Sequence, residues 1–121
     1  MKKILNLTQH ESTKEQKDQG VFEPSKKDKE YIKQLLTFED IPSKDLLEQR
    51  AKSLTAIALT YGVEKIMIGG APYFMSFLER ELKFIGMKLV YSFSKRVVEE
   101  VQNDKEVVKI SSFKHIGFIE L

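Results

Sequence analysis

The stretch Ile66-Met67-Ile68-Gly69-Gly70-Ala71-Pro72 decides how this chain folds. Three apolar residues are too few for a helix, and the glycines that bound them are typical of the end of a strand buried inside a sheet. Pro72 suits the first position of a helix, where its missing N–H costs nothing. The stretch therefore predicts a buried strand, a tight Gly69-Gly70-Ala71-Pro72 turn and then a helix.

The helix after this turn and the strand that follows it complete a βαβ unit. Apolar side chains recur at helical spacing up to Gly86, namely Phe74, Phe77, Leu78, Leu82 and Ile85. Lys88 to Phe93 then reads as the next strand. Two strands joined by a helix in this way should be parallel, with a right-handed crossover.

The residues before this unit predict one strand and three helices. The apolar run from Ile4 to Leu7 predicts a strand, and Ser12-Thr13-Lys14-Glu15 reads as a capping box for a short helix that ends at Gly20. Helix caps at Pro24–Asp28 and at Pro42-Ser43 predict two more helices. The clearest helix is the one after Pro42-Ser43, whose apolar face consists of Leu47, Ala51, Leu54, Ala58 and Tyr61.

Valine-rich segments follow Ser94-Lys95-Arg96 and flank four polar residues, Gln102 to Lys105, which predict a hairpin turn. A last β-prone stretch runs from Phe113 to Ile119. Together these elements predict an α/β fold, a single Rossmann-like three-layer domain with a mainly parallel sheet plus a C-terminal β-hairpin. The first strand and the strands ending at Ile68 and Phe93 should lie side by side with their carboxyl ends together. The hairpin should extend the sheet or reach a second subunit, because an exposed valine-rich edge invites pairing.

Length and charge favour one domain with a small anionic ligand. A chain of 121 residues, 41% of them hydrophobic, can fill one core, so residues 1–121 should form a single domain. The 20 basic and 18 acidic side chains nearly cancel, whereas proteins that coat long nucleic acids carry a strong basic excess. We therefore expect no long nucleic acid as a partner.

The absence of cysteine and of long apolar segments indicates the compartment. Without cysteine there are no disulfides, zinc–thiolate sites, iron–sulfur clusters or thiol nucleophiles, and a reducing compartment fits. The amino terminus, from Met1, starts like a signal peptide but becomes polar at Thr8-Gln9-His10. No segment approaches the roughly 20 apolar residues of a membrane span. These features predict a cytoplasmic protein without a membrane partner.

Glycines or polar side chains follow three of the predicted strands. Gly69-Gly70-Ala71 offers backbone N–H groups and a helix start, which suit a phosphate. Ser92 and the run Ser94-Lys95-Arg96 end the next strand, where hydroxyls and cations can bind phosphate oxygens. Thr8-Gln9-His10 closes the first strand, and His10 can donate to a phosphate or act as an acid. Because the carboxyl ends of parallel strands face one crevice, these segments should converge.

Each of these segments also has an ordinary structural interpretation. The glycines can simply form a tight turn, the basic pair can be solvated, and His10 or His115 can be a surface or capping residue. Two histidines far apart in sequence and scattered carboxylates give no recognisable metal-ligand spacing, so no metal or other cofactor is predicted. The sequence has no Gly-x-Ser-x-Gly turn either, which leaves a serine triad unsupported.

Most of the chain resembles a known group of proteins. Its segments follow in this order: a strand ending in Thr8-Gln9-His10, a strand into Gly69-Gly70-Ala71-Pro72, the run Tyr91-Ser92-Phe93-Ser94-Lys95-Arg96-Val97-Val98-Glu99-Glu100, a charged hairpin and the closing Phe113-Lys114-His115-Ile116-Gly117-Phe118. This order is similar to that of the small stand-alone CRISPR-associated Rossmann-fold (CARF) proteins. Within that group the chain is most similar to the single-domain ring nucleases of type III systems. It departs from them at the turn, where members carry a Gly-x-x-Gly-like or Gly-Glu-containing loop.

The resemblance implies a homodimer that holds a cyclic oligoadenylate, the tetramer, across its twofold axis and cuts it without metal. The products would be linear oligoadenylates with a 2′,3′-cyclic phosphate, which would switch off type III CRISPR signalling. The candidate catalytic residues are then His10, Ser94, Lys95 and Arg96. The candidate ligand-binding residues are Thr8, Gln9, Gly69, Gly70, Ala71 and Ser92. Two alternatives stay open: a non-catalytic sensor or sponge for such a nucleotide, and a nucleotide-binding domain of a mobile element unrelated to CRISPR.

Overall fold

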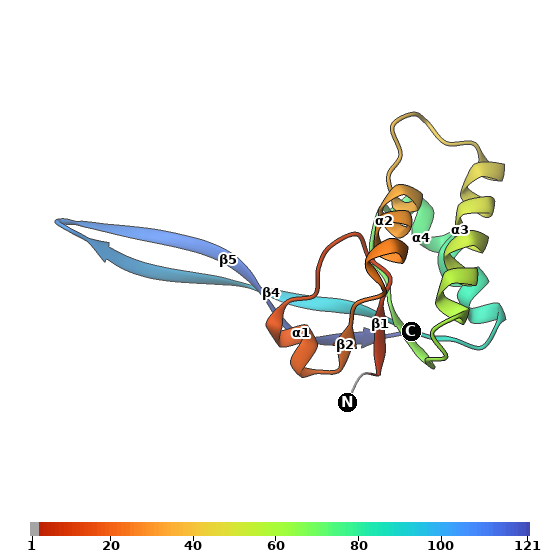
Figure 1. Cartoon of the computed structure of the whole chain (residues 1–121). Coiled ribbons are helices and arrows are strands. Elements are labelled where there is room, and N and C mark those ends of the chain that lie inside the picture. Colours follow the sequence, from red (N-terminus) through yellow and green to blue (C-terminus); the bar gives the residue numbers. More distant parts are fainter. Residues whose placement is uncertain (1–2) are drawn as a thin grey trace.

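A computed structural model describes residues 3–121 of the chain; the first two residues of the signal-like start, Met1 and Lys2, lie outside the described part. Helices and strands are interspersed along the sequence (Figure 1). In chain order they are β1 (Ile4–Asn6), α1 (Lys14–Asp18), β2 (Val21–Phe22), α2 (Lys26–Leu36), α3 (Lys44–Leu59), β3 (Lys65–Met67), α4 (Pro72–Phe84), β4 (Lys88–Asn103) and β5 (Glu106–Glu120).

The strands form one five-stranded sheet in the order β2-β1-β3-β4-β5. β1 pairs in parallel with both β2 and β3, β3 pairs in parallel with β4, and β4 and β5 are antiparallel. The prediction of an α/β fold with a mainly parallel sheet and a C-terminal hairpin is confirmed. β1, β3 and β4 are parallel neighbours, so the carboxyl ends of β1 and β3 meet at one edge, beside the residues of β4 that follow Val90. β3 lies in the middle of the sheet, which explains its unbroken apolar sequence.

The two faces of the sheet are covered very differently. On one face, Leu5, Leu7, Ile66, Ile68 and Leu89 pack with the buried side chains of α2, α3 and α4 in the larger core. On the other face a smaller cluster joins Ile4, Val21, Met67 and Val90 to Phe118. The five-residue α1 lies beside β2 and β5 on this second face. Figure 1 shows α2, α3 and α4 gathered on one side of the sheet.

Helix caps are where the sequence predicted them, with one correction. Ser25 and Ser43 cap α2 and α3 by accepting the N–H of Asp28 and Leu46, and Pro72 opens α4. The box expected at Ser12 to Glu15 is shifted by one residue. Thr13 is the actual cap of α1, and it exchanges hydrogen bonds with Gln16.

Ser12 is not the cap because its hydroxyl is used elsewhere, as a donor to Glu23. β2 was not predicted at all. It consists of two residues, which are too few to show any periodicity.

The C-terminal strands are longer than predicted. β4 does not end at Phe93 but runs on to Asn103, and Phe113–Ile119 is part of β5 rather than a separate closing strand. The predicted turn between the strands is confirmed at Asp104-Lys105. Asp104 has a φ of 54°, a left-handed conformation that aspartate tolerates better than most residues. The prediction failed because Ser94-Lys95-Arg96 looked like a break, whereas a strand exposed on both faces accepts polar residues anywhere.

The distal halves of β4 and β5 form a two-stranded ribbon that projects far from the body of the molecule (Figure 1). We call the paired residues 95–114 the ribbon. Its base is marked by a shift in register between Phe93 and Ser94. Bulges of this kind re-aim a strand as it leaves a sheet.

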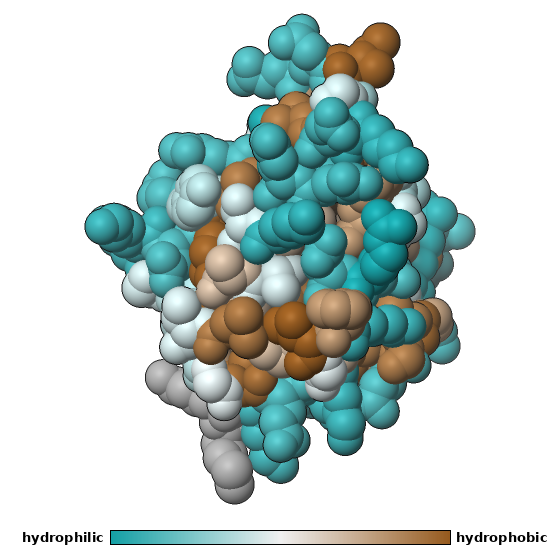
Figure 2. Space-filling model, turned by 90° about the vertical axis from the view of Figure 1, so that its right-hand side faces the viewer, coloured by the Kyte–Doolittle hydropathy of each residue, from teal (hydrophilic) through white to brown (hydrophobic). Residues whose placement is uncertain are grey.

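The helical side of the molecule is mostly hydrophilic, with apolar side chains gathered in the lower half of that view (Figure 2). Exposed apolar residues close to the ends of α3 and α4 are Leu59, Phe84 and Ile85. Within residues 3–121, no helix is both long and apolar enough to cross a membrane.

Candidate functional site

A pocket of about 320 Å³ lies at the carboxyl ends of β1 and β3, beside Tyr91 and Ser92 of β4 and next to the start of α1. Three of its segments are the ones that the sequence predicted to converge: Thr8-Gln9-His10, Gly69-Gly70 and Ser92. The remaining lining residues are Glu11, Thr13, Gln16, Met67, Ile68 and Tyr91. The predicted crevice therefore exists, and polar groups from three strand ends face it.

The Gly69-Gly70 turn gives the pocket backbone donors. Within residues 3–121, the N–H groups of Gly69, Gly70 and Ala71 donate to no protein acceptor, and the cap of α4 at Ala71 has no side-chain bond. A Cβ at Gly70 would come within 3.1 Å of Met75 Cε, so a side chain there would crowd the first turn of α4. Ala71 itself lies just outside the lining. Unpaired N–H groups at a helix start suit an anion.

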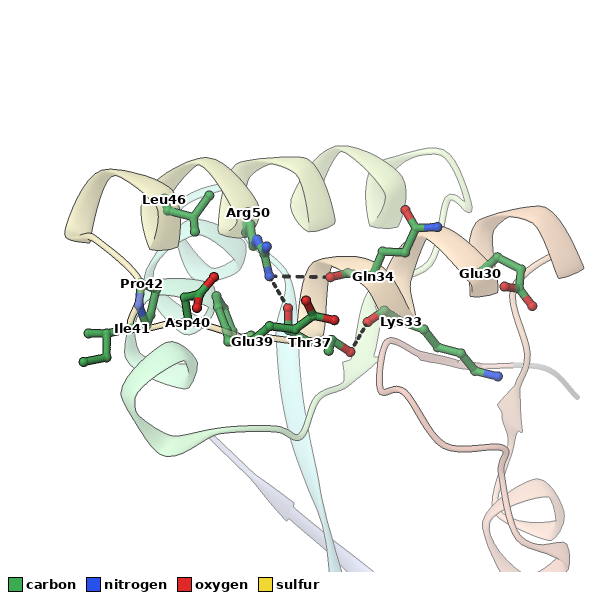
Figure 3. Close-up of a pocket in the computed structure, with 11 residues that line it drawn as sticks. Glu30, Lys33, Gln34, Thr37, Glu39, Asp40, Ile41, Pro42, Leu46 and Arg50 are labelled. Carbon is green, nitrogen blue, oxygen red and sulfur yellow. Dashed lines mark hydrogen bonds between the residues drawn. The ribbon is translucent and has the colours of Figure 1, made fainter.

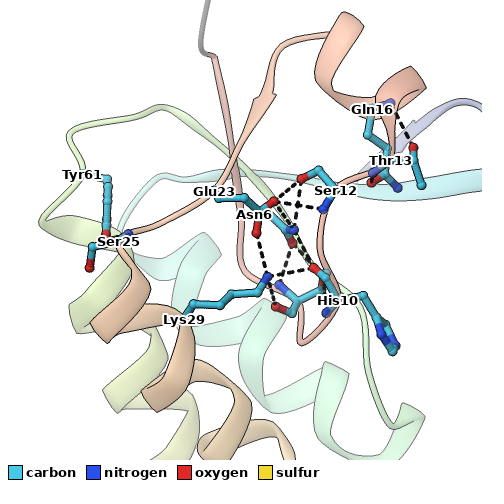
Figure 4. A network of polar contacts seen from close by, with 10 residues as sticks. Asn6, His10, Ser12, Thr13, Gln16, Glu23, Ser25, Lys29 and Tyr61 are labelled. Atoms are coloured by element: carbon cyan, nitrogen blue, oxygen red, sulfur yellow. Dashed lines mark hydrogen bonds and ion pairs between the residues drawn. The ribbon is translucent and has the colours of Figure 1, made fainter.

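A buried polar cluster fixes the loop that carries Thr8 and His10 (Figure 4). Asn6, which is fully buried, donates from Nδ2 to the His10 carbonyl at 2.8 Å and to Glu23 Oε2 at 2.7 Å. Its Oδ1 accepts the N–H and the hydroxyl of Thr8 at 2.9 and 2.7 Å. Lys29 Nζ donates to the Thr8 and His10 carbonyls at 3.0 and 2.7 Å. The loop is thus held from beneath, and the His10 ring points away from the cluster.

Glu23 is the charged centre of this cluster. Its Oε1 lies 2.9 Å from Lys29 Nζ, and both side chains are largely buried. Burial alone would raise the pKa of Glu23, but hydrogen bonds from Ser12, Asn6 and Lys29, together with the lysine charge, lower it to about 2. Glu23 is therefore ionised at neutral pH and pairs with Lys29. Lys29 does not line the strand-end pocket and instead holds the loop through the Thr8 and His10 carbonyls.

Ser92 and the buried His115 form a second polar group at the pocket. Ser92 Oγ lies 2.6 Å from His115 Nδ1 and 3.1 Å from Gln16 Nε2. His115 Nε2 lies 2.8 Å from Gln19 Oε1, and the His115 ring packs on Phe118. Burial lowers the pKa of His115, against an opposing effect of Glu15. The imidazole is therefore neutral at pH 7.

Tyr91 closes the pocket beside Ser92 but turns its hydroxyl away toward α4. The hydroxyl donates to Glu79 Oε2 at 2.6 Å. Burial and this bond raise the pKa of Tyr91, so the phenol keeps its proton at any physiological pH. The residue is an aromatic wall rather than an acid or a base.

Besides Ala71, three predicted site residues lie outside this pocket. Ser94, Lys95 and Arg96 are exposed at the base of the ribbon, past the register shift. Arg96 Nε donates to Ser111 Oγ at 2.7 Å across the ribbon. Among the described residues, the pocket lining contains no lysine or arginine. The fold thus brings together the first-strand, glycine-turn and Ser92 candidates but not the basic pair of the same chain.

A larger hollow of about 500 Å³ lies between the end of α2 and the start of α3 (Figure 3). Arg50 lines it, but its Nη1 donates to the carbonyls of Thr37 and Leu35 at 2.5 and 3.3 Å and caps the end of α2. The guanidinium also lies over the Phe38 ring, 4.5 Å from its centre. Among the described residues, its lining has three carboxylates, Glu30, Glu39 and Asp40, against Lys33 and this structural arginine, and this charge balance disfavours an anionic ligand. We therefore prefer the strand-end pocket.

Several site residues could not be found by sequence reasoning. Asn6 has a weak signal, as a polar residue inside the apolar run Ile4–Leu7. Gln16, Gln19 and Lys29 have none, because they look like ordinary surface residues of helices. Within the described part of the chain, no cluster of three or more histidines, aspartates or glutamates is placed to hold a metal.

Comparison with known proteins yields one informative result. No curated protein and no solved structure matches the chain. The family model of the uncharacterized protein MJ1673 family matches residues 2–119, almost the whole sequence. The chain therefore belongs to the uncharacterized protein MJ1673 family.

Proposed function

We propose that the strand-end pocket binds a phosphate-bearing nucleotide, specifically a cyclic oligoadenylate such as the cyclic tetra-adenylate. The observation that carries this proposal is the meeting of unpaired Gly69 and Gly70 N–H groups with polar side chains at one edge of a parallel sheet. Nucleotides bind at this edge in open α/β sheets, where backbone donors and a helix start meet phosphate oxygens. The sequence resemblance to CARF proteins supplies the identity of the nucleotide.

The reaction we propose is metal-independent cleavage of the ring. The ligand's own 2′-hydroxyl attacks the adjacent phosphorus, which forms a 2′,3′-cyclic phosphate and opens the ring. Positioning alone can lower such a barrier by up to roughly 7–11 kcal/mol. Thr8, Gln9 and His10 would orient the ribose or assist proton transfer, while cations stabilise the developing charge.

We further propose a cytoplasmic location and a Rossmann-like relationship for the fold, with α1 as a reduced third layer.

The cations would come from a second copy of the chain. Among residues 3–121, the lining of the pocket has no lysine or arginine, whereas Lys95 and Arg96 are exposed on the ribbon. The ribbon carries apolar side chains on both of its faces, including Val98, Val101 and Phe113, and charges of both signs. Such a surface can pair with its own copy around a twofold axis. We therefore propose a homodimer in which each ribbon completes the partner's pocket.

Calorimetric titration of the parent protein with cyclic tetra-adenylate in the presence of a chelator tests this function. We expect saturable binding, and chromatography of the same samples should show linear products. Binding without products would identify a sensor or sponge. Absence of binding would leave a nucleotide-binding domain of a different kind, as expected for a mobile-element protein unrelated to CRISPR.

Substitution of the basic pair tests the role of the ribbon. Arg96→Ala should weaken binding about ten- to hundredfold, and more than Lys95→Ala, because a guanidinium can contact a phosphate with two hydrogen bonds. Lys109→Ala, which removes a charge farther along the ribbon, is the matched control. Thermal melts should barely change in any of the three. If Arg96→Ala and Lys95→Ala both bind cyclic tetra-adenylate like the parent, the phosphate site lies elsewhere and the two side chains are simply solvated.

A further inference from the structure

A chain of hydrogen bonds runs from α1 through Ser92 to His115, and its direction is fixed at both ends by the backbone. At one end the Thr13 N–H, which can only donate, points to Gln16 Oε1 at 2.9 Å. The amide nitrogen of Gln16 therefore faces Ser92 Oγ, at 3.1 Å, and donates to it. Ser92 thus accepts a hydrogen bond from α1.

The other end of the chain is fixed in the same way. The Ile116 carbonyl, which can only accept, lies 3.1 Å from Gln19 Nε2. Gln19 Oε1 therefore faces His115 Nε2, which must carry the ring proton of the neutral imidazole. His115 Nδ1 is left as an acceptor, and the only hydrogen available to it at 2.6 Å is the hydroxyl proton of Ser92.

This polarity determines what Ser92 can do for a ligand. Its hydroxyl proton is committed to His115 and one lone pair is committed to Gln16, so one lone pair of Oγ remains. Ser92 lines the pocket, and the remaining lone pair of its Oγ can only accept a hydrogen bond. The ligand group that meets it must be a donor, and a ribose hydroxyl is one.

We propose that Ser92 and His115 form a proton relay that takes the proton of a ligand hydroxyl in the pocket; this rests on the proposed nucleotide function. Ser92 touches the ligand, and His115 acts through it. As the 2′-oxygen bonds to phosphorus, its proton passes to Ser92 Oγ while the Ser92 proton passes to His115 Nδ1. The bond from phosphorus to the 5′-oxygen breaks, and that oxygen takes a proton from water. His115 then returns its proton to solvent.

The surroundings of His115 fit a base. On β4 its neighbour is the neutral Ser92, and on β5 it packs against the neutral Phe118. The neutral Gln19, which caps the end of α1, and Glu15 of α1 are its other neighbours. Glu15 is the charged side chain that acts on the ring, and it stabilises the imidazolium formed after proton transfer. A neutral base with a nearby carboxylate is arranged to gain a proton in the transition state.

The tautomer of His115 can be measured by nitrogen NMR on the parent protein, without any ligand. We expect the proton on Nε2 and a titration midpoint below that of an ordinary histidine. A ring that carries its proton on Nδ1 would overturn the relay. This measurement requires no variant, so a folding defect cannot obscure it.

Kinetics separate the relay from the binding function. Ser92→Ala should slow cleavage of cyclic tetra-adenylate about 10²–10⁴-fold, the usual contribution of a general base, while its Kd changes less than about tenfold. Ser76→Ala, an exposed serine of α4, is the matched control and should cleave like the parent. The parent rate should rise with pH until His115 is neutral and then level off, and Ser92→Ala should lose this profile.

The outcomes distinguish the two proposals. If the parent does not bind the nucleotide, the proposed function fails and the relay fails with it. If the parent binds and cleaves but Ser92→Ala cleaves equally fast, or keeps the same pH profile, only the relay is wrong. If the parent binds without cleaving, the binding proposal stands and Ser92 is a hydrogen-bond acceptor alone.

Discussion

One strand, β4, belongs to two very different environments. Among its first residues, Leu89 is buried in the core beneath the helices, and Val90 is buried on the opposite face of the sheet with Phe118. After the register shift at Phe93 and Ser94, the same strand has a single neighbour and nearly every side chain is exposed. In the body, alternation of side chains decides which face of the sheet each one joins. In the ribbon, apolar and charged residues appear on both faces without penalty.

The comparison shows that the two regions are stabilised by different means. The body buries apolar area, which contributes roughly 25 cal/mol for each Å² removed from water. The ribbon buries little and depends on cross-strand pairs, each contributing about 0.2–1 kcal/mol. A two-stranded hairpin with no third strand is marginal in water. We therefore expect the ribbon to gain order from a second copy of the chain, whereas the body folds without one.

The largest expected effect contrasts a core residue with a ribbon residue. Phe74→Ala should lower the free energy of unfolding by about 3–5 kcal/mol, because the side chain is fully buried against the sheet. Val98→Ala, in the ribbon, should change it by less than about 0.5 kcal/mol. Urea denaturation at low protein concentration measures both. Equal losses would show that the ribbon is part of the cooperative fold of one chain.

The second effect concerns the Glu23–Lys29 pair beneath the Thr8–His10 loop. Glu23→Gln should cost about 3 kcal/mol, because it leaves the buried Lys29 ammonium without its counter-ion. Glu30→Gln, an exposed carboxylate of α2, is the matched control and should be nearly neutral.

The same pair should control stability in acid. Because the pKa of Glu23 is lowered to about 2, its contribution is complete above pH 4.5 and is lost as the pH falls toward 2. The lowered pKa of His115 acts in the same direction, with loss starting below pH 6.5. Urea denaturation of the parent and Glu23→Gln between pH 7 and 2 tests this. The variant should show a shallower decline below pH 4.5, and identical slopes would contradict the assignment.

The smallest expected effect is that of removing the ribbon. Joining Lys95 to Lys114 through Asn-Gly deletes the distal strands and keeps the paired residues at their base. The midpoint of thermal unfolding at low concentration should shift by only a few degrees, because the core is untouched. We expect sedimentation to find a dimer for the parent and a monomer for the shortened chain. A dimer that persists without the ribbon would place the interface on the body instead.

The sequence by itself determined the local architecture. The apolar run before Gly69-Gly70-Ala71-Pro72 predicted the central strand, the turn and the start of α4, and all three are confirmed. Cap residues predicted the starts of α2 and α3. The parallel βαβ unit then predicted which strand ends share an edge. These features follow from backbone preferences and side-chain periodicity, which act over a few neighbouring residues.

Only the tertiary structure decided which polar side chains meet. Ser92 reaches His115 because β4 and β5 are paired with a register shift between Phe93 and Ser94, and Gln16 joins them because α1 lies on that face of the sheet. Asn6, Glu23 and Lys29 come from three separate elements and form one buried cluster. No periodicity encodes such contacts, since each depends on the packing of segments far apart in sequence. The sequence also did not predict how far the exposed part of β4 extends, because the end of an exposed ribbon is not marked by a pattern of buried side chains.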